Sequence, residues 1–172
     1  KYGNEAKKIF DDGKRLLDQI VSEKWLTAKA IISIRPAYAE NECIFADDIK
    51  FHFPRQTVDK GPNENNFCLA DFVAPKNDFL GMFALTTGHG LEKIVKRFED
   101  HDDDYNAIMS KILADRLAEA FAERMHERVR KEFWGYEGDE KMDNDQLIKE
   151  KYQGIRPAPG YPACPSHEEK DK

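Results

Sequence analysis

Apolar residues recur at intervals of three and four in two long stretches of the chain, with charged residues between them. This spacing places the apolar side chains on one face of a helix. It predicts an amphipathic helix over residues 4–24, locally weakened by Gly13, and one proline-free helix from about 103 to 134. Two shorter helices are expected at about 91–98 and 144–152.

Short apolar runs predict strands in the first half of the chain. The β-branched run 30–34 is expected to form a hairpin with 43–45, across the polar loop 40–42. Residues 67–74 and 79–86 are expected to be largely buried strands. About four strands followed by the longest helices favour an α+β fold, with an antiparallel sheet covered by helices that include the long one.

Turn-forming and acidic segments punctuate this pattern. Residues 57–66 contain Lys60-Gly61-Pro62-Asn63 and are expected to form a surface loop. The acidic run 100–104 suits the N-terminus of the long helix, where negative charge is favourable. The chain has no internal repeat, G-x-G-x-x-G motif or P-loop, so a Rossmann fold is not favoured.

Length and charge narrow the classes of protein. The 172 residues are enough for one domain with a core. A formal net charge of −6 argues against general nucleic-acid binding. No apolar run approaches the roughly 18 residues that span a bilayer. We therefore expect a cytoplasmic protein with neither nucleic acid nor membrane as a partner.

The cysteines and histidines do not form a ligand pattern. Cys43, Cys68 and Cys164 are odd in number and far apart, and are expected to be reduced thiols. The five histidines are scattered, without H-E-x-x-H spacing. No protein-held metal is expected.

A second, charged stripe runs beside the apolar stripe of the long helix. Its members are spaced three and four apart: Arg116, Glu119, Glu123, His126 and Arg130. The favoured interpretation is a solvated face of ion pairs, each worth only tenths of a kcal/mol. Alternatively, one carboxylate, that of Glu119, faces a ligand cleft, although the spacing alone does not single it out.

The segment with the most distinctive composition is 154–165, Gly-Ile-Arg-Pro-Ala-Pro-Gly-Tyr-Pro-Ala-Cys-Pro. Its prolines exclude regular helix, and one interpretation is an exposed proline-rich linker or polyproline recognition strip. A second is a stiff loop that holds a zwitterionic ligand, since it offers one guanidinium and one phenol beside backbone carbonyls and amides.

This run closely resembles the signature loop of the methionine synthase activation domain. Three further stretches resemble the same family in the same order: 68–75 (Cys-Leu-Ala-Asp-Phe-Val-Ala-Pro), 103–109 (Asp-Asp-Tyr-Asn-Ala-Ile-Met), and 114–123 together with 126–130. The chain is thus similar to the S-adenosylmethionine-binding activation, or reactivation, domain of cobalamin-dependent methionine synthase.

The resemblance implies a methyltransferase that carries a methyl group from methyltetrahydrofolate through cobalamin to homocysteine. The activation domain would serve repair, in which cob(II)alamin is remethylated with S-adenosylmethionine and an electron from a flavodoxin-type or diflavin reductase. Cobalamin would be bound mainly by the neighbouring cobalamin-binding domain of the same enzyme, which this domain would cap.

The resemblance also implies roles for individual residues. Arg156 would bind the ligand's carboxylate, a task suited to a planar, two-pronged donor. Tyr161 would lie beside the methyl-bearing sulfonium and is the candidate catalytic residue, while Ala158 would offer backbone groups. Glu119 and Glu150 match acidic positions near the ligand cleft. Neither glutamate need transfer a proton, because methyl transfer depends on alignment of donor and acceptor.

The resemblance covers most of residues 1–169, so we expect a single activation domain over 1–172 that is truncated at both ends. An expected aspartate contact would precede Lys1 and an aromatic pair would follow Lys172, so the isolated fragment is not expected to be active alone. Residues 33–55 depart from the family pattern. Two alternatives remain: a noncatalytic interaction module using the proline-rich loop and charged helix, and a fragment of only structural value.

Overall fold

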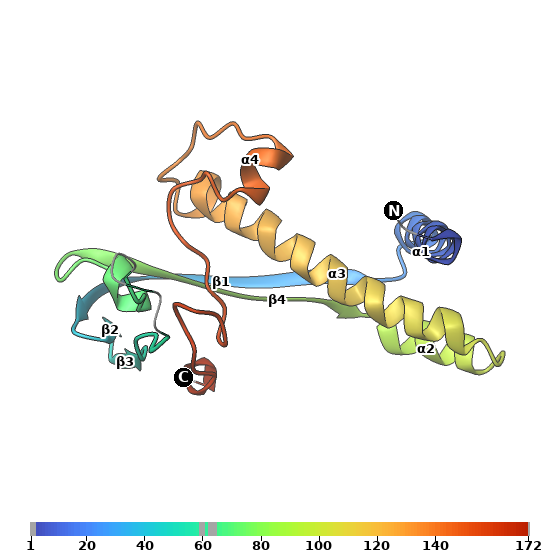
Figure 1. Ribbon diagram of the computed structural model, residues 1–172, viewed down its shortest axis with the longest axis horizontal. Coiled ribbons are helices and arrows are strands. Elements are labelled where there is room, and N and C mark those ends of the chain that lie inside the picture. Colours follow the sequence, from blue (N-terminus) through green and yellow to red (C-terminus); the bar gives the residue numbers. More distant parts are fainter. Residues whose placement is uncertain (1–2, 59–60, 62–64, 172) are drawn as a thin grey trace. The chain divides into compact units, whose positions relative to one another are not determined.

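The computed structural model describes residues 3–58, 61 and 65–171, and Figure 1 shows the course of the chain. Two compact units are present. The first consists of Lys1–Ile31 and Phe83–Arg128, and the second of Ile32–Met82 and Val129–Lys172. The expectation that 1–172 is one domain stays a prediction.

The described residues form a four-stranded sheet in the order β3-β2-β1-β4. Strand β1 pairs antiparallel with β2, and β2 with β3. These pairings and the long helix confirm the predicted α+β class with an antiparallel sheet. The bounds of the strands are Thr27–Glu40 for β1, Cys43–Ala46 for β2, Ile49–His52 for β3 and Asp78–His89 for β4.

The first hairpin is present, but its partners differ from the prediction. Tyr38 pairs with Phe45, and Glu40 with Cys43, so β2 lies against the end of β1 rather than against residues 30–34. Asn41 adopts a positive φ of 53° in the turn, which lets two residues join the strands. The rings of Tyr38 and Phe45 stack with centroids 4.9 Å apart, which supports this register.

The expectation of a strand at 67–74 is wrong. This segment contains a 3-10 helix, η1 (Leu69–Phe72), and its N-terminus is capped by Asp71, whose Oδ2 accepts from the Cys68 amide at 3.1 Å. Cys68 and Ala70 are buried whereas Phe72 is exposed. A short apolar run cannot by itself separate a strand from a helical turn. The strand that completes the sheet is instead β3, which the sequence pattern did not predict.

The bounds of the first three helices lie close to those that the apolar periodicity predicted, although several of the apolar residues, such as Ile108 and Ile112 of the long helix, are exposed. Helix α1 spans Asn4–Ser22, α2 spans Leu91–Glu99, and α3 spans Asp104–Arg128 and continues into one π-helical turn, η2 (Val129–Phe133). Together α3 and η2 confirm the long helix. Helix α4 (Asn144–Ile148) is shorter than expected. A last 3-10 turn, η3, spans Glu168–Asp171.

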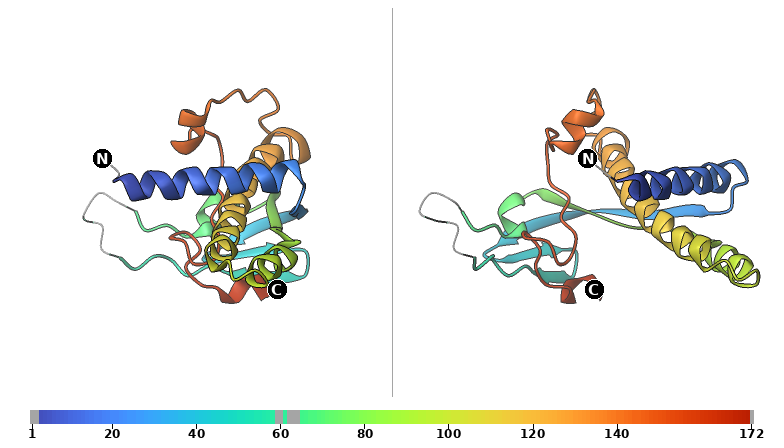
Figure 2. Two further views of the ribbon diagram at one scale, coloured as in Figure 1. Left: turned by 90° about the vertical axis from the view of Figure 1, so that its right-hand side faces the viewer. Right: turned by 45° about the vertical axis from the view of Figure 1, so that its right-hand side comes forward.

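The core of the first unit joins α1 to α3. Leu16, Ile20 and Met109 are buried together, with Phe98 of α2 packed against them. Figure 2 shows α2 lying along α3, both within this unit. An added Cβ on Gly13 would lie 3.4 Å from Met109 Sδ. A methyl group at this position would therefore make only an ordinary van der Waals contact with α3.

The acidic run before α3 has the structural role that the sequence predicted. Asp103 accepts hydrogen bonds from the backbone amide and the side-chain Nδ2 of Asn106, at 3.0 and 2.7 Å. These hydrogen bonds lower the pKa of Asp103. Its carboxylate thus satisfies an otherwise unpaired amide in the first turn of the helix.

Three further expectations concern a loop, the cysteines and the absence of a membrane span. The expected loop at 57–66 includes residues 59–60 and 62–64, which lie outside the described residues. Cys43, Cys68 and Cys164 are all free thiols, as predicted. Among the helices of the described residues, none combines the length and apolar character needed to cross a membrane.

Candidate functional site

The proline-rich loop, residues 154–165, belongs to the second unit and contains a tight turn. The Gly160 amide donates to the Cys164 carbonyl at 2.8 Å, and the Cys164 amide donates to the Tyr161 carbonyl at 2.9 Å. The Tyr161 amide donates to the Ala158 carbonyl at 3.0 Å. Gly160 has a φ of 97°. A residue with a Cβ would be destabilised in this conformation by about 1–2 kcal/mol, the usual cost of the left-handed region. The loop is therefore a defined structure rather than a free linker.

The end of the loop is held against η1 and the sheet. The Leu69 amide donates to the Ala163 carbonyl at 2.9 Å. Cys164 is buried in the same apolar cluster as Cys68 and Ile44. Burial raises the pKa of both of these thiols, which keeps them protonated and apolar in character. They serve as core residues at the base of the loop.

An ion pair fixes η1, on which the loop rests. Arg55 donates from Nη1 and Nη2 to the two carboxylate oxygens of Asp71, at 2.6 and 2.7 Å. It also donates to the Asn66 carbonyl at 2.8 Å. The hydrogen bond from Arg55 is the main cause of the lowered pKa of Asp71. Sequence reasoning gave neither residue a role, since 16 positions separate them.

The start of the loop is held by an aromatic group. Tyr136 Oη donates to the Gln153 carbonyl at 3.2 Å. Gly154 follows with a φ of 93°, and an added Cβ there would lie only 2.7 Å from Tyr136 Oη. The Tyr136 ring packs edge-on against Trp134, at 5.4 Å between centroids, and Trp134 in turn contacts Phe79 of β4.

The charged stripe of the long helix is not uniformly solvated. Arg116 and Glu119 form an exposed pair at 2.7 Å, as the favoured interpretation predicted. His126 and Arg130, by contrast, are buried, at 4% and 1% exposed. The helical spacing gave no sign of this burial, because the groups that contact Arg130 come from later in the chain. The solvated interpretation is therefore wrong for these two residues.

Three of the five predicted ligand-contact residues lie in the proline-rich loop, and the other two lie outside it. Arg156 is half-buried, Ala158 is exposed, and Tyr161 is 63% exposed, all within the proline-rich loop. Glu150 is exposed and has a positive φ of 51°, between α4 and the loop. Glu119 lies on α3 in the first unit. The structure thus brings three of the five residues together in one loop, and their roles stay predictions.

The loop is suited to holding a ligand rather than to acid–base catalysis. It presents a guanidinium, an exposed phenol and backbone polar groups on a backbone restrained by proline. A guanidinium can accept a carboxylate on two prongs, and a phenol offers an aromatic face and one donor. Within the described parts of the chain, no group of three or more metal-ligating side chains occurs.

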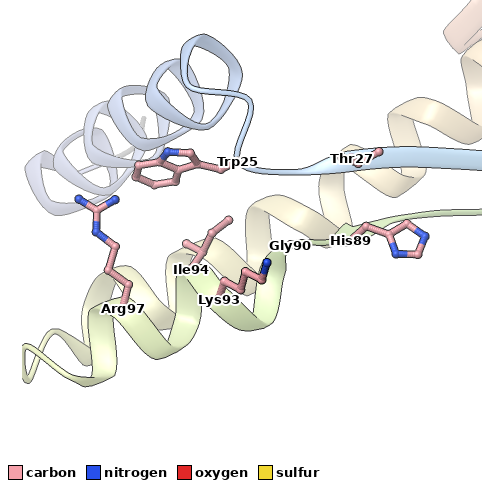
Figure 3. A pocket seen from close by; sticks show the side chains of 7 residues that line it. All are labelled: Trp25, Thr27, His89, Gly90, Lys93, Ile94 and Arg97. Carbon is pink, nitrogen blue, oxygen red and sulfur yellow. The ribbon is translucent and has the colours of Figure 1, made fainter.

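A separate pocket lies in the first unit, and Figure 3 shows its lining residues. It has a volume of about 480 Å³. The guanidinium of Arg97 lies 5.2 Å from the centre of the Trp25 ring, and Lys93 lines the pocket beside the start of α2. The five predicted ligand-contact residues are not among those that line it.

Comparison with known proteins places the chain in a family. The family model for the activation domain of vitamin B12-dependent methionine synthase matches residues 1–172. The chain therefore belongs to the vitamin B12-dependent methionine synthase activation domain family.

Among solved structures, the chain is similar to the MetH reactivation domain, whose crystal structure contains bound AdoHcy. The two share 46% sequence identity and superpose with a TM-score of 0.85. The similarity covers 97% of this chain and 55% of that one, so this chain spans little more than half the length of the related structure.

Proposed function

We propose that this domain binds S-adenosylmethionine through the proline-rich loop and supports reductive remethylation of cob(II)alamin. The observation that carries the proposal is the loop itself, in which Arg156 and the exposed Tyr161 lie on a backbone held at both ends. The similarity to a reactivation domain bound to AdoHcy supports the same ligand class.

Three residues of the loop have distinct tasks in this proposal. Arg156 pairs with the carboxylate of the methionine moiety, and Ala158 contributes backbone hydrogen bonds. Tyr161 lies beside the sulfonium, where its ring and hydroxyl orient the reactive methyl group. Alignment of this kind is the main requirement for methyl transfer, because no proton has to be moved.

Two glutamates complete the set of predicted ligand-contact residues. Glu150 precedes the loop closely and is exposed, so its carboxylate is available to attract the cationic sulfonium. Glu119 lies in the other unit and pairs with Arg116. We assign Glu150 to the ligand cleft, where it contributes through charge rather than as a proton donor, and the role of Glu119 stays a prediction.

The wider activity depends on parts of the enzyme outside this chain. We assign the domain to a cytoplasmic methyltransferase, methionine synthase, whose neighbouring domain binds most of the cobalamin. When held by that neighbouring domain, cobalamin would supply a cobalt centre able to accept the methyl group after one-electron reduction. A flavodoxin-type or diflavin reductase provides that electron. This chain binds the methyl donor, S-adenosylmethionine, and forms the surface that presents it.

Titration calorimetry with S-adenosylmethionine tests the proposal. We expect binding by residues 1–172 and tighter binding by a longer chain extended at both ends, because more of the ligand surface would then be buried. Methionine alone and adenosine alone serve as controls for partial recognition. A folded longer chain with no affinity for S-adenosylmethionine would contradict the proposal and favour the noncatalytic interaction module.

A further inference from the structure

We propose that Arg130, Glu140 and Tyr152 form a positioning cluster that fixes the place of Arg156 in the proline-rich loop. The inference rests on the proposed function in one respect, namely that Arg156 binds the ligand. The cluster itself lies wholly in the second unit. None of its three residues is among the proposed ligand contacts. Its residues are positioning residues rather than catalytic ones.

The cluster is a buried, two-pronged ion pair covered by an aromatic ring. Arg130 donates from Nε and Nη2 to the two oxygens of Glu140, at 2.6 and 2.7 Å. The side chains are only 1% and 3% exposed. The Tyr152 ring lies 4.1 Å from Arg130 Cζ, so the guanidinium also makes a cation–π contact. Three segments meet at one planar group.

The backbone around Arg130 adds to this arrangement. The Trp134 amide donates to the Val129 carbonyl at 2.9 Å, which makes this turn π-helical. The Glu137 amide donates to the Arg130 carbonyl at 2.9 Å. Arg130 thus holds the following turn through both its carbonyl and its side chain. A π-helical turn is often found at functional sites.

The connection from the cluster to Arg156 is short. Tyr152 precedes Arg156 by four residues, and consecutive Cα atoms are separated by about 3.8 Å. Between them, the Gln153 carbonyl accepts from Tyr136, and Gly154 packs against the same hydroxyl. Pro157 restricts the backbone immediately beyond. Because this connection is short and restrained, we expect a displacement of Tyr152 to displace Arg156 as well.

The buried Arg130–Glu140 pair is expected to contribute more to the orientation of the cluster than to the free energy of unfolding. Burial lowers the pKa of Arg130, but the hydrogen bonds and charge of Glu140 outweigh it, so the net pKa is raised and the guanidinium stays charged. A buried ion pair can often be replaced by apolar residues without loss of stability, whereas removal of one partner is strongly destabilising. Orientation is the property that such a replacement would remove.

The double variant Arg130→Met/Glu140→Leu separates positioning from stability. In a longer chain extended at both ends, three properties are measured: the urea midpoint, S-adenosylmethionine affinity by calorimetry, and ¹⁵N order parameters of residues 153–156 without ligand. We expect a nearly unchanged midpoint, at least tenfold weaker binding, and lower order parameters. Arg130→Lys should give an intermediate affinity, since an ammonium keeps the charge but not the planar fork.

The matched control is Lys96→Gln/Asp100→Asn, which removes an exposed ion pair in the first unit and should change none of the three properties. If the apolar double variant does not fold, Tyr152→Leu keeps the ion pair and carries the same test. Wild-type affinity and order parameters in a folded cluster variant would overturn the inference. If the wild type binds no S-adenosylmethionine, the proposed function fails, and the order parameters still decide whether the cluster positions the loop.

Discussion

The amide of Leu69 donates a hydrogen bond to the carbonyl of Ala163 at 2.9 Å. This bond joins η1 to the end of the proline-rich loop, next to the buried Cys164. The loop is thus held by a 3-10 turn at its end and by Tyr136 at its start. The part between these contacts includes the exposed Tyr161, which is consistent with a fixed loop that presents side chains to a ligand.

The Arg55–Asp71 pair should make stability depend on pH in the acid range. The pKa of Asp71 is lowered in the folded protein, so its contribution is present above the usual aspartate pKa of about 4 and is lost as pH falls through the folded value. Urea midpoints of wild type and Asp71→Asn should therefore differ at pH 7 and converge towards pH 3. Asp48→Asn, at an exposed position, is the control. A constant difference between wild type and Asp71→Asn across this range would refute the assignment.

Gly160→Ala should destabilise the protein by about 1–2 kcal/mol, because φ is 97° and an added Cβ disfavours this conformation. The Cβ would also lie 2.7 Å from His167 Nε2, but this side chain can move. Adding His167→Ala should consequently not restore stability. Gly138→Ala is the matched control, because the φ of Gly138 is not positive and the surrounding space accommodates a methyl group. Urea unfolding gives the comparison, and full rescue by His167→Ala would show that the steric contact matters instead.

The hairpin offers a matched pair of isoleucines for the core of the second unit. Ile44 on β2 is 0% exposed and Ile49 on β3 is 39% exposed. Ile44→Ala should cost roughly 2–5 kcal/mol, as is usual for a large-to-small change in a core, and Ile49→Ala less than about 1 kcal/mol. Denaturant unfolding measures both. Equal costs would mean that the apolar cluster around Ile44 is not the core of this unit.

Sequence reasoning succeeded where the pattern was long and failed where it was short. The long helix has many apolar repeats and an acidic cap at Asp103, so periodicity and chemistry agree. The run 67–74 has too few residues to distinguish a strand from a helical turn, and Asp71 decides in favour of the turn. Strand β3 is equally short and was missed.

The candidate site was predictable to a similar degree. The resemblance drew attention to Arg156 and Tyr161, because both lie in one local motif. The residues that hold this motif come from elsewhere in the chain, so their pairing has no local signal. Arg130 is the clearest example, since helical spacing placed it on a solvated face whereas Glu140 and Tyr152 enclose it.

The most direct test of the account is the affinity of Arg156→Ala for S-adenosylmethionine, measured by calorimetry in a chain extended at both ends. Loss of a two-pronged partner for the ligand carboxylate should weaken binding by on the order of 2–5 kcal/mol. Arg156→Lys should recover only part of this loss, because it lacks the planar fork. Thermal midpoints without ligand should change little in either variant. Wild-type affinity in both variants, or unfolding of the ligand-free Arg156→Ala protein, would contradict the claim that Arg156 acts on the ligand rather than on the fold.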